Sequence, residues 1–309
     1  MTLTREPETD RGPAPLAPAD GRWPIELLWA GERDGSAGGL RGGILPPELQ
    51  ARYQGRLEIP MRGDRPTLVA NFVSTLDGVV ALDRRGATGG REISGGFEPD
   101  RFVMGLLRAT ADAVLVGAGT VRASRTHGWT PGHAHPASAG AFAAWRRLLG
   151  LDTPAPATVI VTASGDLEPR HIPGPDSEVI VVTTASGARN LADLPRGSHV
   201  EIVPVRGPDS VRAETLLAFL ESRGFRVVLT EGGPTLFGEL LAASLVDEVF
   251  LTLAPQLAGR GPAADRLNLV EGAALTPGTS WAGLRSVMRS NDHLFLRYQL
   301  ASPSRKDLS

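Results

Sequence analysis

Two glycine-rich segments of this chain have the residue types of a phosphate-binding turn. Each follows a short apolar run and precedes a helix-like stretch, and they read Val116-Gly117-Ala118-Gly119-Thr120 and Glu231-Gly232-Gly233-Pro234-Thr235-Leu236. Glycine lets backbone N–H groups approach phosphate oxygens with no Cβ in the way, and the start of a helix favours negative charge. The threonines add hydroxyl donors, and proline suits the first helical turn. Because neither segment is a Walker loop or a Gly-x-Gly-x-x-Gly fingerprint, each indicates either a phosphorylated ligand such as a nucleotide or a plain tight turn.

Three charged residues stand where they could contact a polar ligand. Asp77 comes just after the first apolar run, Glu231 ends a strand beside the second glycine pair, and Arg108 ends an apolar helix face. A carboxylate at a strand end can contact substrate, and an arginine can hold a phosphate. Each also has a structural alternative, namely an Asp-Gly turn at Asp77, an ion pair or cap at Glu231, and pairing with the helix dipole at Arg108.

Strand-like apolar runs alternate with helix-like spacing from residue 66 onward. Helices are predicted at 97–110, 137–150, 209–223 and 234–243, and strands at 67–73, 112–116, 157–162, 178–183, 199–203, 226–230, 246–254, 284–290 and 293–300. A short turn joins the last two strands, so that pair is antiparallel. The pattern predicts an α/β fold with an open, mostly parallel sheet, flanking helices and antiparallel C-terminal strands. Such sheets bind ligands beyond the carboxyl ends of their strands, where both glycine-rich segments lie.

Composition narrows the classes of function. The 309 residues carry 32 Lys+Arg against 34 Asp+Glu, so we expect no nucleic-acid partner and no attraction to a membrane surface. Cysteine is absent, which excludes disulfides, thiolate catalysis and zinc–cysteine sites. His127, His133 and His135 are close in sequence, but no carboxylate stands at ligand spacing and we expect no metal. With no signal peptide and no apolar run of about 20 residues, we expect a cytoplasmic protein.

Three motifs, in this order, carry a resemblance to a known family. They are Asn71-Phe72-Val73-Ser74-Thr75-Leu76-Asp77-Gly78, then Leu107-Arg108-Ala109 followed by Asp112-Ala113-Val114-Leu115-Val116-Gly117-Ala118-Gly119-Thr120, then Thr230-Glu231-Gly232-Gly233-Pro234-Thr235-Leu236. The chain resembles the pyrimidine reductase family of riboflavin biosynthesis over about residues 66–300. The fold of that family is similar to dihydrofolate reductase.

The resemblance implies an NADPH-dependent enzyme that acts on a small molecule and forms a homodimer. The family reduces the ribosyl group of 5-amino-6-(5-phosphoribosylamino)uracil to a ribityl chain. The resemblance implies catalytic roles for Asp77 and Glu231 and substrate contacts from Asn71, Ser94, Arg108 and Glu231. The implied cofactor-binding residues are Gly117, Gly119, Thr120, Thr162, Ser164, Gly232, Gly233, Pro234, Thr235 and Leu236.

The chain departs from the family in two places. Residues 124–131 replace the usual Asp-Asp-Pro-x-Leu-Thr-x-Arg stretch, and the zinc deaminase often fused to this reductase has no cysteines to build it. The altered stretch leaves open dihydrofolate, or another pterin-like or pathway-specific heterocycle, as the substrate. A non-catalytic NADP(H)-binding protein is a further alternative.

We expect three regions along the chain. Residues 1–65 form an N-terminal extension that is partly disordered, with an apolar patch at 23–30 that docks on the main body. Residues 66–301 form the reductase domain, and 302–309 form a flexible tail.

Overall fold

The computed structural model describes residues 23–31, 38–82, 90–124, 128–194, 199–205, 210–259, 265–275 and 281–300. The predicted flexible tail at 302–309 and the first 22 residues of the predicted extension lie outside these ranges. His127, together with 125–126 of the altered stretch, also lies outside them.

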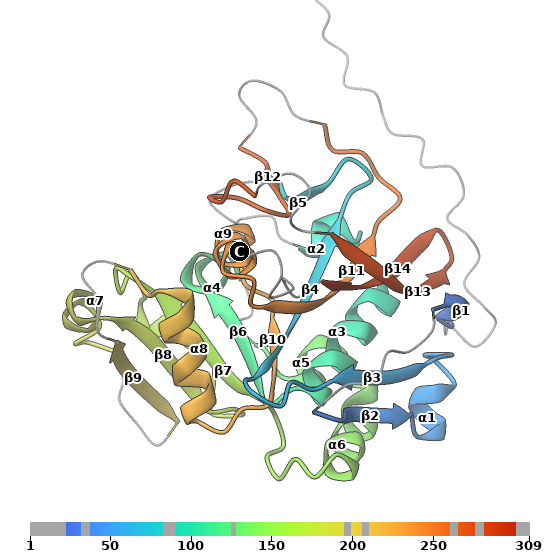
Figure 1. Ribbon diagram of the computed structural model, residues 1–309, viewed down its shortest axis with the longest axis horizontal. Helices are drawn as coiled ribbons and strands as arrows, with labels where there is room; N and C mark the ends of the chain where they lie inside the picture. The colour runs from blue at the N-terminus through green and yellow to red at the C-terminus, as the bar shows by residue number, and fades with distance from the viewer. Residues whose placement is uncertain are drawn as a thin grey trace, which may run out of the picture.

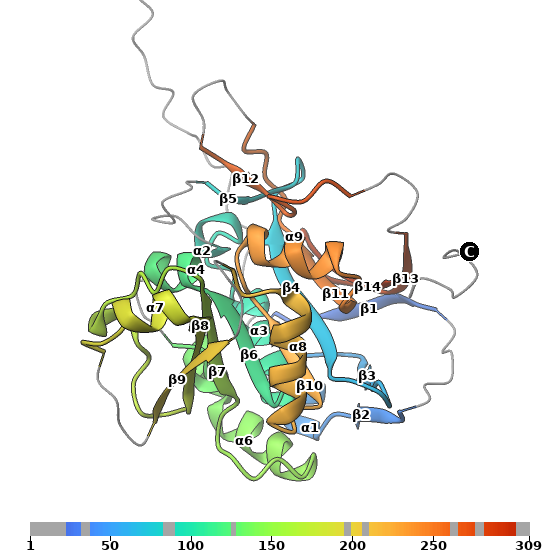
Figure 2. The same ribbon diagram turned by 60° about the vertical axis from the view of Figure 1, so that its left-hand side comes forward.

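The described residues form one large sheet of ten strands (Figures 1 and 2). Seven neighbouring strands run parallel, whereas the strands at one end pair antiparallel. In spatial order they are β1 (Glu26–Ala30), β13 (Ala282–Ser290), β14 (His293–Leu300), β11 (Val246–Leu253), β4 (Thr67–Ser74), β10 (Val227–Thr230), β6 (Ala113–Gly117), β7 (Ala157–Thr162), β8 (Val179–Thr184) and β9 (Val200–Val205). The predicted fold class is confirmed.

Helices cover both faces of this sheet, as Figure 2 shows. On one face, α3 (Glu98–Thr110) and α6 (Ala139–Leu148) join an apolar core that includes Phe102, Phe142 and Trp145, and the short helix α5 (Pro131–Ala134) packs against α3. On the other face, α8 (Ala213–Ser222) and α9 (Pro234–Ala242) pack Leu216 and Phe237 against the strands. Parallel strands covered on both faces need apolar residues at nearly every position, and all six residues of β8 are buried.

The predicted elements from residue 66 onward are present, with ends shifted by a few residues. The largest shift is in α8, which begins at Ala213, four residues after the predicted start, and α6 begins at Ala139 because a short 3₁₀ turn at Pro136–Ser138 precedes it. A helix, α4 (Ala118–Ala123), follows the first glycine-rich segment as expected. The sequence patterns did not predict the short elements α1 (Pro47–Gln50), α2 (Gly90–Ile93), α7 (Ala185–Asn190), β2 (Leu40–Ile44), β3 (Arg56–Pro60), β5 (Val79–Ala81) and β12 (Leu267–Asn268).

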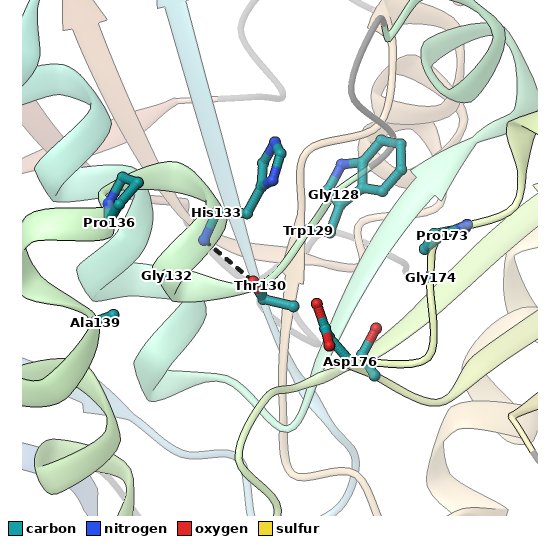
Figure 3. Close-up of a pocket in the computed structure, with 11 residues that line it drawn as sticks. Gly128, Trp129, Thr130, Gly132, His133, Pro136, Ala139, Pro173, Gly174 and Asp176 are labelled. Carbon is teal, nitrogen blue, oxygen red and sulfur yellow. Dashed lines mark hydrogen bonds between the residues drawn. The ribbon is translucent and has the colours of Figure 1, made fainter.

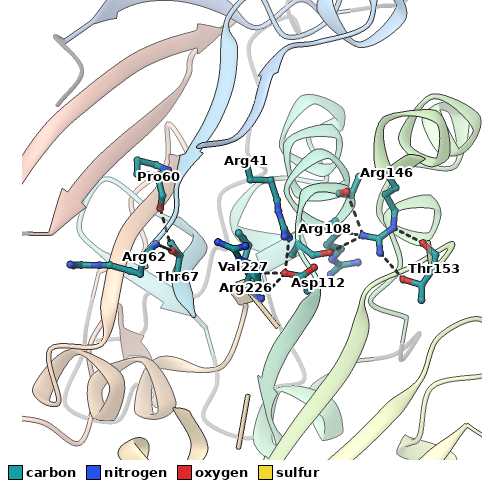
Figure 4. Close-up of polar contacts among 12 residues, drawn as sticks. Arg41, Pro60, Arg62, Thr67, Arg108, Asp112, Arg146, Thr153, Arg226 and Val227 are labelled. Atoms are coloured by element: carbon teal, nitrogen blue, oxygen red, sulfur yellow. Dashed lines mark hydrogen bonds and ion pairs between the residues drawn. The ribbon is translucent and has the colours of Figure 1, made fainter. Parts of the chain in front are cut away.

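The described part of the N-terminal extension packs on the main body. β1 pairs with β13 as the edge strand of the large sheet, so the apolar patch at 23–30 docks there. β2 and β3 form a separate antiparallel hairpin. Arg41 of this hairpin donates to Asp112 Oδ2 over 2.6 Å, and the same oxygen accepts the backbone N–H groups of Arg226 and Val227 (Figure 4). The extension is thereby tied to the amino ends of β6 and β10.

A buried arginine closes the carboxyl end of α3. Arg146 of α6 is 1% exposed, and its guanidinium donates to Ala111 O over 2.7 Å and to Thr153 O over 2.9 Å (Figure 4). The last carbonyls of a helix have no partner within the helix, so a cation there satisfies them and stabilises the helix dipole. Burial lowers the pKa of Arg146 to about 10, which leaves the side chain charged at neutral pH.

We expect Arg146→Met to lower the free energy of unfolding by about 3 kcal/mol, because it leaves buried carbonyls without donors. Arg147→Met is the matched control, since Arg147 is the exposed neighbour on the same helix and its loss should change stability by no more than about 0.5 kcal/mol. Urea denaturation followed by circular dichroism measures both. Equal unfolding midpoints for the two variants would contradict the role given to Arg146.

Candidate active site

The structure brings the two glycine-rich segments together at the carboxyl edge of the sheet. β10 and β6 are parallel neighbours with Thr230 opposite Leu115, and the backbone N–H of Glu231 donates to Leu115 O over 3.0 Å. A Cβ added at Gly233 would lie 3.2 Å from Thr120 Oγ1, which shows how closely the second segment approaches the first. Parallel strands that end together present both turns, and the helices α4 and α9 after them, to one ligand.

The two segments form a cradle that is open at Gly119. Gly119 is exposed, and a Cβ added there would meet no protein atom within 4 Å. A Cβ at Gly232 would instead lie 2.7 Å from Leu236 Cδ2, so packing explains that glycine. The N–H groups of Thr235 and Leu236, in the first turn of α9, have no acceptor within the helix. An open glycine beside unpaired helical N–H groups fits the diphosphate of a dinucleotide.

Two of the predicted cofactor-binding residues, Thr162 and Ser164, lie at the carboxyl end of β7 and in the turn after it. Thr162 is buried and its hydroxyl accepts the N–H of Gly165 over 3.0 Å, so Thr162 shapes the turn from inside. Gly165 has φ +69°, and a Cβ there would lie 2.2 Å from Gly187 O, so this turn needs glycine. Ser164 is exposed and can reach a ligand.

Arg108 and Glu231, 123 positions apart in sequence, form a bidentate ion pair. Arg108 Nε donates to Oε1 over 2.9 Å and Nη2 donates to Oε2 over 2.6 Å. The side chains are only 5% and 10% exposed. Arg108 Nη1 also donates to the carbonyls of Gly128 and Thr130 over 3.2 and 3.3 Å. The pair joins the last turn of α3 to the end of β10. The predicted contact of Arg108 and Glu231 with substrate stays a prediction.

Asp77 lies in an exposed turn and joins a separate hydrogen-bond cluster. Its carboxylate accepts from Thr75 Oγ1 over 2.6 Å, from Ala258 N over 3.1 Å and from Gly259 N over 2.6 Å. The hydroxyl of Thr75, followed by the two backbone N–H groups, lowers the pKa of Asp77 to about 2. The carboxyl group of Asp77 is therefore ionised at neutral pH, so it can accept hydrogen bonds but is a poor proton donor.

The two remaining residues predicted to contact substrate, Ser94 and Asn71, differ in exposure. Ser94 is buried, with 3% of its surface exposed. Asn71 is half-buried, and it shares a strand face with Val69, which packs in the core under α3.

Asp100, a buried carboxyl in the first turn of α3, was not among the site residues predicted from the sequence. Its side chain is hydrogen-bonded to those of Thr252 and Ser94. Burial, with a smaller contribution from the nearby Glu231 carboxylate, raises the pKa of Asp100 to about 6. An acidic residue in a first helical turn is common for reasons of the helix dipole, so no sequence signal marked it. A raised pKa beside a charged pair is typical of functional sites.

A pocket adjoins the Arg108 end of the site (Figure 3). Gly128 and Thr130, whose carbonyls accept from Arg108, line it, and Thr130 Oγ1 accepts the N–H of His133 over 3.1 Å. Burial, followed by the charges of Arg108 and Arg101, lowers the pKa of His133. The remaining lining residues are Trp129, Gly132, Pro136, Ala139, Pro173, Gly174, Asp176 and Ser177.

Among the residues that the structure describes, no group of three or more His, Asp or Glu side chains could hold a metal ion. No helix in the described ranges is long and apolar enough to cross a membrane.

Similarity to known proteins agrees with this geometry. The chain is 30% identical over 211 residues to the 2,5-diamino-6-ribosylamino-4(3H)-pyrimidinone 5′-phosphate reductase of Methanothermobacter thermautotrophicus, covering 68% of this chain and 86% of the relative. It is 27% identical to the enzyme of the same name from Archaeoglobus fulgidus, covering 63% and 83%. The fold matches a deaminase/5-amino-6-(5-phosphoribosylamino)uracil reductase from Thermotoga maritima with a TM-score of 0.55 at 24% identity, covering 77% of this chain and 57% of that one. Residues 66–276 match the model of the RibD C-terminal domain. With the glycine cradle and the charged pair inside the matched range, the chain belongs to the RibD C-terminal domain family of reductases.

Proposed function

We propose that this protein uses NADPH to reduce the ribosyl group of a 6-ribosylaminopyrimidine 5′-phosphate in riboflavin biosynthesis. The observation that carries the proposal is the buried Arg108–Glu231 pair beside a cradle of two glycine-rich turns. The archaeal relatives are named as reductases of such a substrate, and they are matched over most of their length. The base is either 5-aminouracil, as the sequence resemblance implies, or the 2,5-diaminopyrimidinone of the relatives.

The residues of the cradle would hold the cofactor in two parts. Gly117, Gly119 and Thr120 would contact the nicotinamide–ribose end, and the first turn of α9 would bind the diphosphate. Ser164 would face the adenosine end, with Thr162 holding its turn in place. When bound, NADPH supplies a hydride to the sugar carbon that becomes electrophilic when the ribose ring opens.

The charged residues would hold the substrate in line with the cofactor. Glu231 is fixed by two hydrogen bonds from Arg108, so neither side chain has to be ordered when substrate binds. Asp77 is ionised and would accept a hydrogen bond from a polar group of the substrate. Asn71, half-buried on β4, would present its amide on the same side of the sheet as α3.

The proposal predicts NADPH oxidation by the purified protein when a 6-ribosylaminopyrimidine 5′-phosphate is present, with formation of the ribitylamino product. Glu231→Gln should reduce kcat/KM by about a hundredfold or more, because it removes one charge of a buried pair at the site. Glu221→Gln, at an exposed position of α8, is the control and should keep wild-type activity. Stabilisation by NADPH with no oxidation on either base would refute the proposed reaction and favour a non-catalytic binding protein.

Gly119 gives a separate test of the cofactor site. A leucine side chain at this position would enter the open space assigned to the cofactor, so Gly119→Leu should weaken NADPH binding by about tenfold or more in calorimetry. Gly140→Leu is the matched control, because Gly140 on α6 also has no neighbour within 4 Å and lies outside the site. Unchanged affinity in Gly119→Leu would place the cofactor elsewhere.

We further propose a homodimer formed through the β1 edge of the sheet. All five residues of β1 are exposed, among them Leu27, Leu28 and Trp29 at 44%, 52% and 46%. Trp281, just before β13, is 75% exposed. Among the described residues β1 is an end strand of the sheet, and a strand edge with apolar side chains favours association with another strand. Two antiparallel copies of β1 centred on Leu28 would place Glu26 opposite Ala30, which brings no like charges together.

Leu28→Lys should convert the dimer to a monomer in analytical ultracentrifugation, since a lysine on an edge strand opposes strand pairing. Leu148→Lys is the control, because Leu148 is also exposed but lies on α6, a helix that packs on α3 and α5 and is not part of the sheet edge. A wild-type monomer, or a Leu28→Lys dimer, would contradict this interface.

A further inference from the structure

We propose that the cavity beside residues 128–130 is a second ligand site, which binds a neutral, planar heterocycle through a carbonyl oxygen and an adjoining pair of N–H donors. Guanine and pterin rings present such an edge. The inference does not depend on the proposed reaction, because none of the residues predicted for substrate or cofactor lines this cavity.

The cavity lies between residues 128–139 and the crossover from β7 to β8 (Figure 3). It has a volume of about 340 Å³, which is enough for a small heterocyclic ligand. Three of its lining residues, Gly128, Trp129 and Thr130, belong to the stretch 124–131 in which the chain departs from the family pattern. The cavity is therefore built partly from residues that the resemblance leaves without a role.

One wall of the cavity supplies a hydrogen-bond donor. Trp129 is only 4% exposed, and its indole N–H makes no hydrogen bond to another described residue. Figure 3 shows the indole with its nitrogen toward the side of the cavity on which His133 lies. An indole N–H can only donate, and a buried donor without an acceptor is costly. A ligand that places a carbonyl oxygen there removes this cost.

A second wall supplies an acceptor. Asp176, in the crossover before β8, is exposed, and its carboxylate has no hydrogen bond or ion pair with another described residue. Figure 3 shows this carboxylate directed into the cavity. A carboxylate only accepts hydrogen bonds, and its two oxygens can take two donors side by side. The ligand therefore presents N–H groups to Asp176.

The group of the ligand that faces the indole is uncharged. The described residues that line the cavity include no lysine or arginine, and burial, followed by the charges of Arg108 and Arg101, lowers the pKa of His133. The guanidinium of Arg108 is engaged by the Glu231 carboxylate and by two carbonyls of the cavity wall. A ligand carboxylate or phosphate would find no cation on these walls, whereas a carbonyl oxygen needs only the indole N–H.

The rest of the lining is flat and small. Pro136, Ala139 and Pro173 present aliphatic surface without long side chains, and a Cβ added at Gly174 would meet no protein atom within 4 Å. Such surfaces pack well against the faces of a planar ring. A 2-amino-4-oxopyrimidine ring meets every requirement, because its amino group and neighbouring ring N–H suit the carboxylate and its carbonyl oxygen suits the indole.

Equilibrium dialysis of the full-length protein with guanosine and inosine tests the donor pair, because inosine differs from guanosine only in lacking the 2-amino group. Guanosine should bind about tenfold more tightly, the effect of one charge-assisted hydrogen bond. Asp176→Asn should nearly abolish this preference, since an amide has a single acceptor oxygen. Asp152→Asn makes the same change at an exposed position outside the cavity and should keep the wild-type preference.

Trp129→Phe tests the second contact separately. Guanosine and inosine share the carbonyl group, so loss of the indole N–H should weaken both by about fivefold and leave the preference between them unchanged. Adenosine has an amino group in place of this carbonyl and should not bind. Because Trp129 packs in the core, a cooperative thermal transition is required of the variant before its affinities are compared.

Three glycine variants locate the bound guanosine. Gly174→Leu fills open space in the cavity and should weaken guanosine binding by about tenfold or more, whereas Gly140→Leu, at an equally open position outside the cavity, should not. Gly119→Leu blocks the glycine cradle and should keep the wild-type affinity for guanosine. The inference is overturned by a wild-type protein that binds no guanosine or does not distinguish it from inosine. Loss of guanosine binding in Gly119→Leu but not in Gly174→Leu would also overturn it.

Pterin distinguishes the two natural sources of this edge, because it carries the same donors and carbonyl on a different fused ring. Tighter binding of pterin assigns the site to a free pterin-like compound, and tighter binding of guanosine assigns it to a nucleoside or nucleotide. Neither result depends on NADPH oxidation, so the proposed reaction and the second site stand or fall separately.

Discussion

The buried ion pair between Arg108 and Glu231 is the interaction on which the arrangement of the site depends. It joins the last turn of α3 to the end of β10, and the same guanidinium holds the 128–130 segment through two carbonyls. Removing either charge would leave the other buried and uncompensated, so helix, strand and loop keep one relative position. Arg146 holds the carboxyl end of the same helix from the other side. The helix that carries Asp100 and Arg108 is thereby fixed before any ligand binds.

Much of the fold could be predicted from the sequence because covered parallel strands have a simple pattern. The runs at 157–162 and 178–183 are apolar at most positions, and they form β7 and β8 almost unchanged. The alternation of buried and exposed residues does not predict β1, because all five of its residues are exposed. Its conformation is set by pairing with β13, about 260 positions away in the sequence. The pattern fails also for β2, where Gly42 and Gly43 at positive φ are poor strand formers and the partner β3 sets the conformation.

The site was predictable to the extent that its residues follow strands. Glycines after β6 and β10 are recognisable in sequence, and parallel neighbouring strands must bring them together, as the close approach of Gly233 to Thr120 shows. The direction of a side chain is not encoded in this way. The hydroxyl of Thr162 accepts a hydrogen bond from the backbone of its own turn, and the side chain of Ser94 is hydrogen-bonded to that of Asp100. Asp100 itself reads as an ordinary acidic residue of a first helical turn, and only packing against β11 reveals that it is buried.

The three carboxylates differ in what compensates their charge, and that difference separates their roles. Asp77 is exposed and has three hydrogen-bond donors, so its charge is stable without a ligand and its pKa is low. Glu231 is buried but has a guanidinium as a fixed partner. Asp100 is buried with two hydroxyl contacts and a like charge nearby, so its ionised form is the least satisfied of the three. Among these three carboxylates, Asp100 is therefore the one whose ionisation the surrounding protein disfavours, because burial and a like charge both act against its charged form.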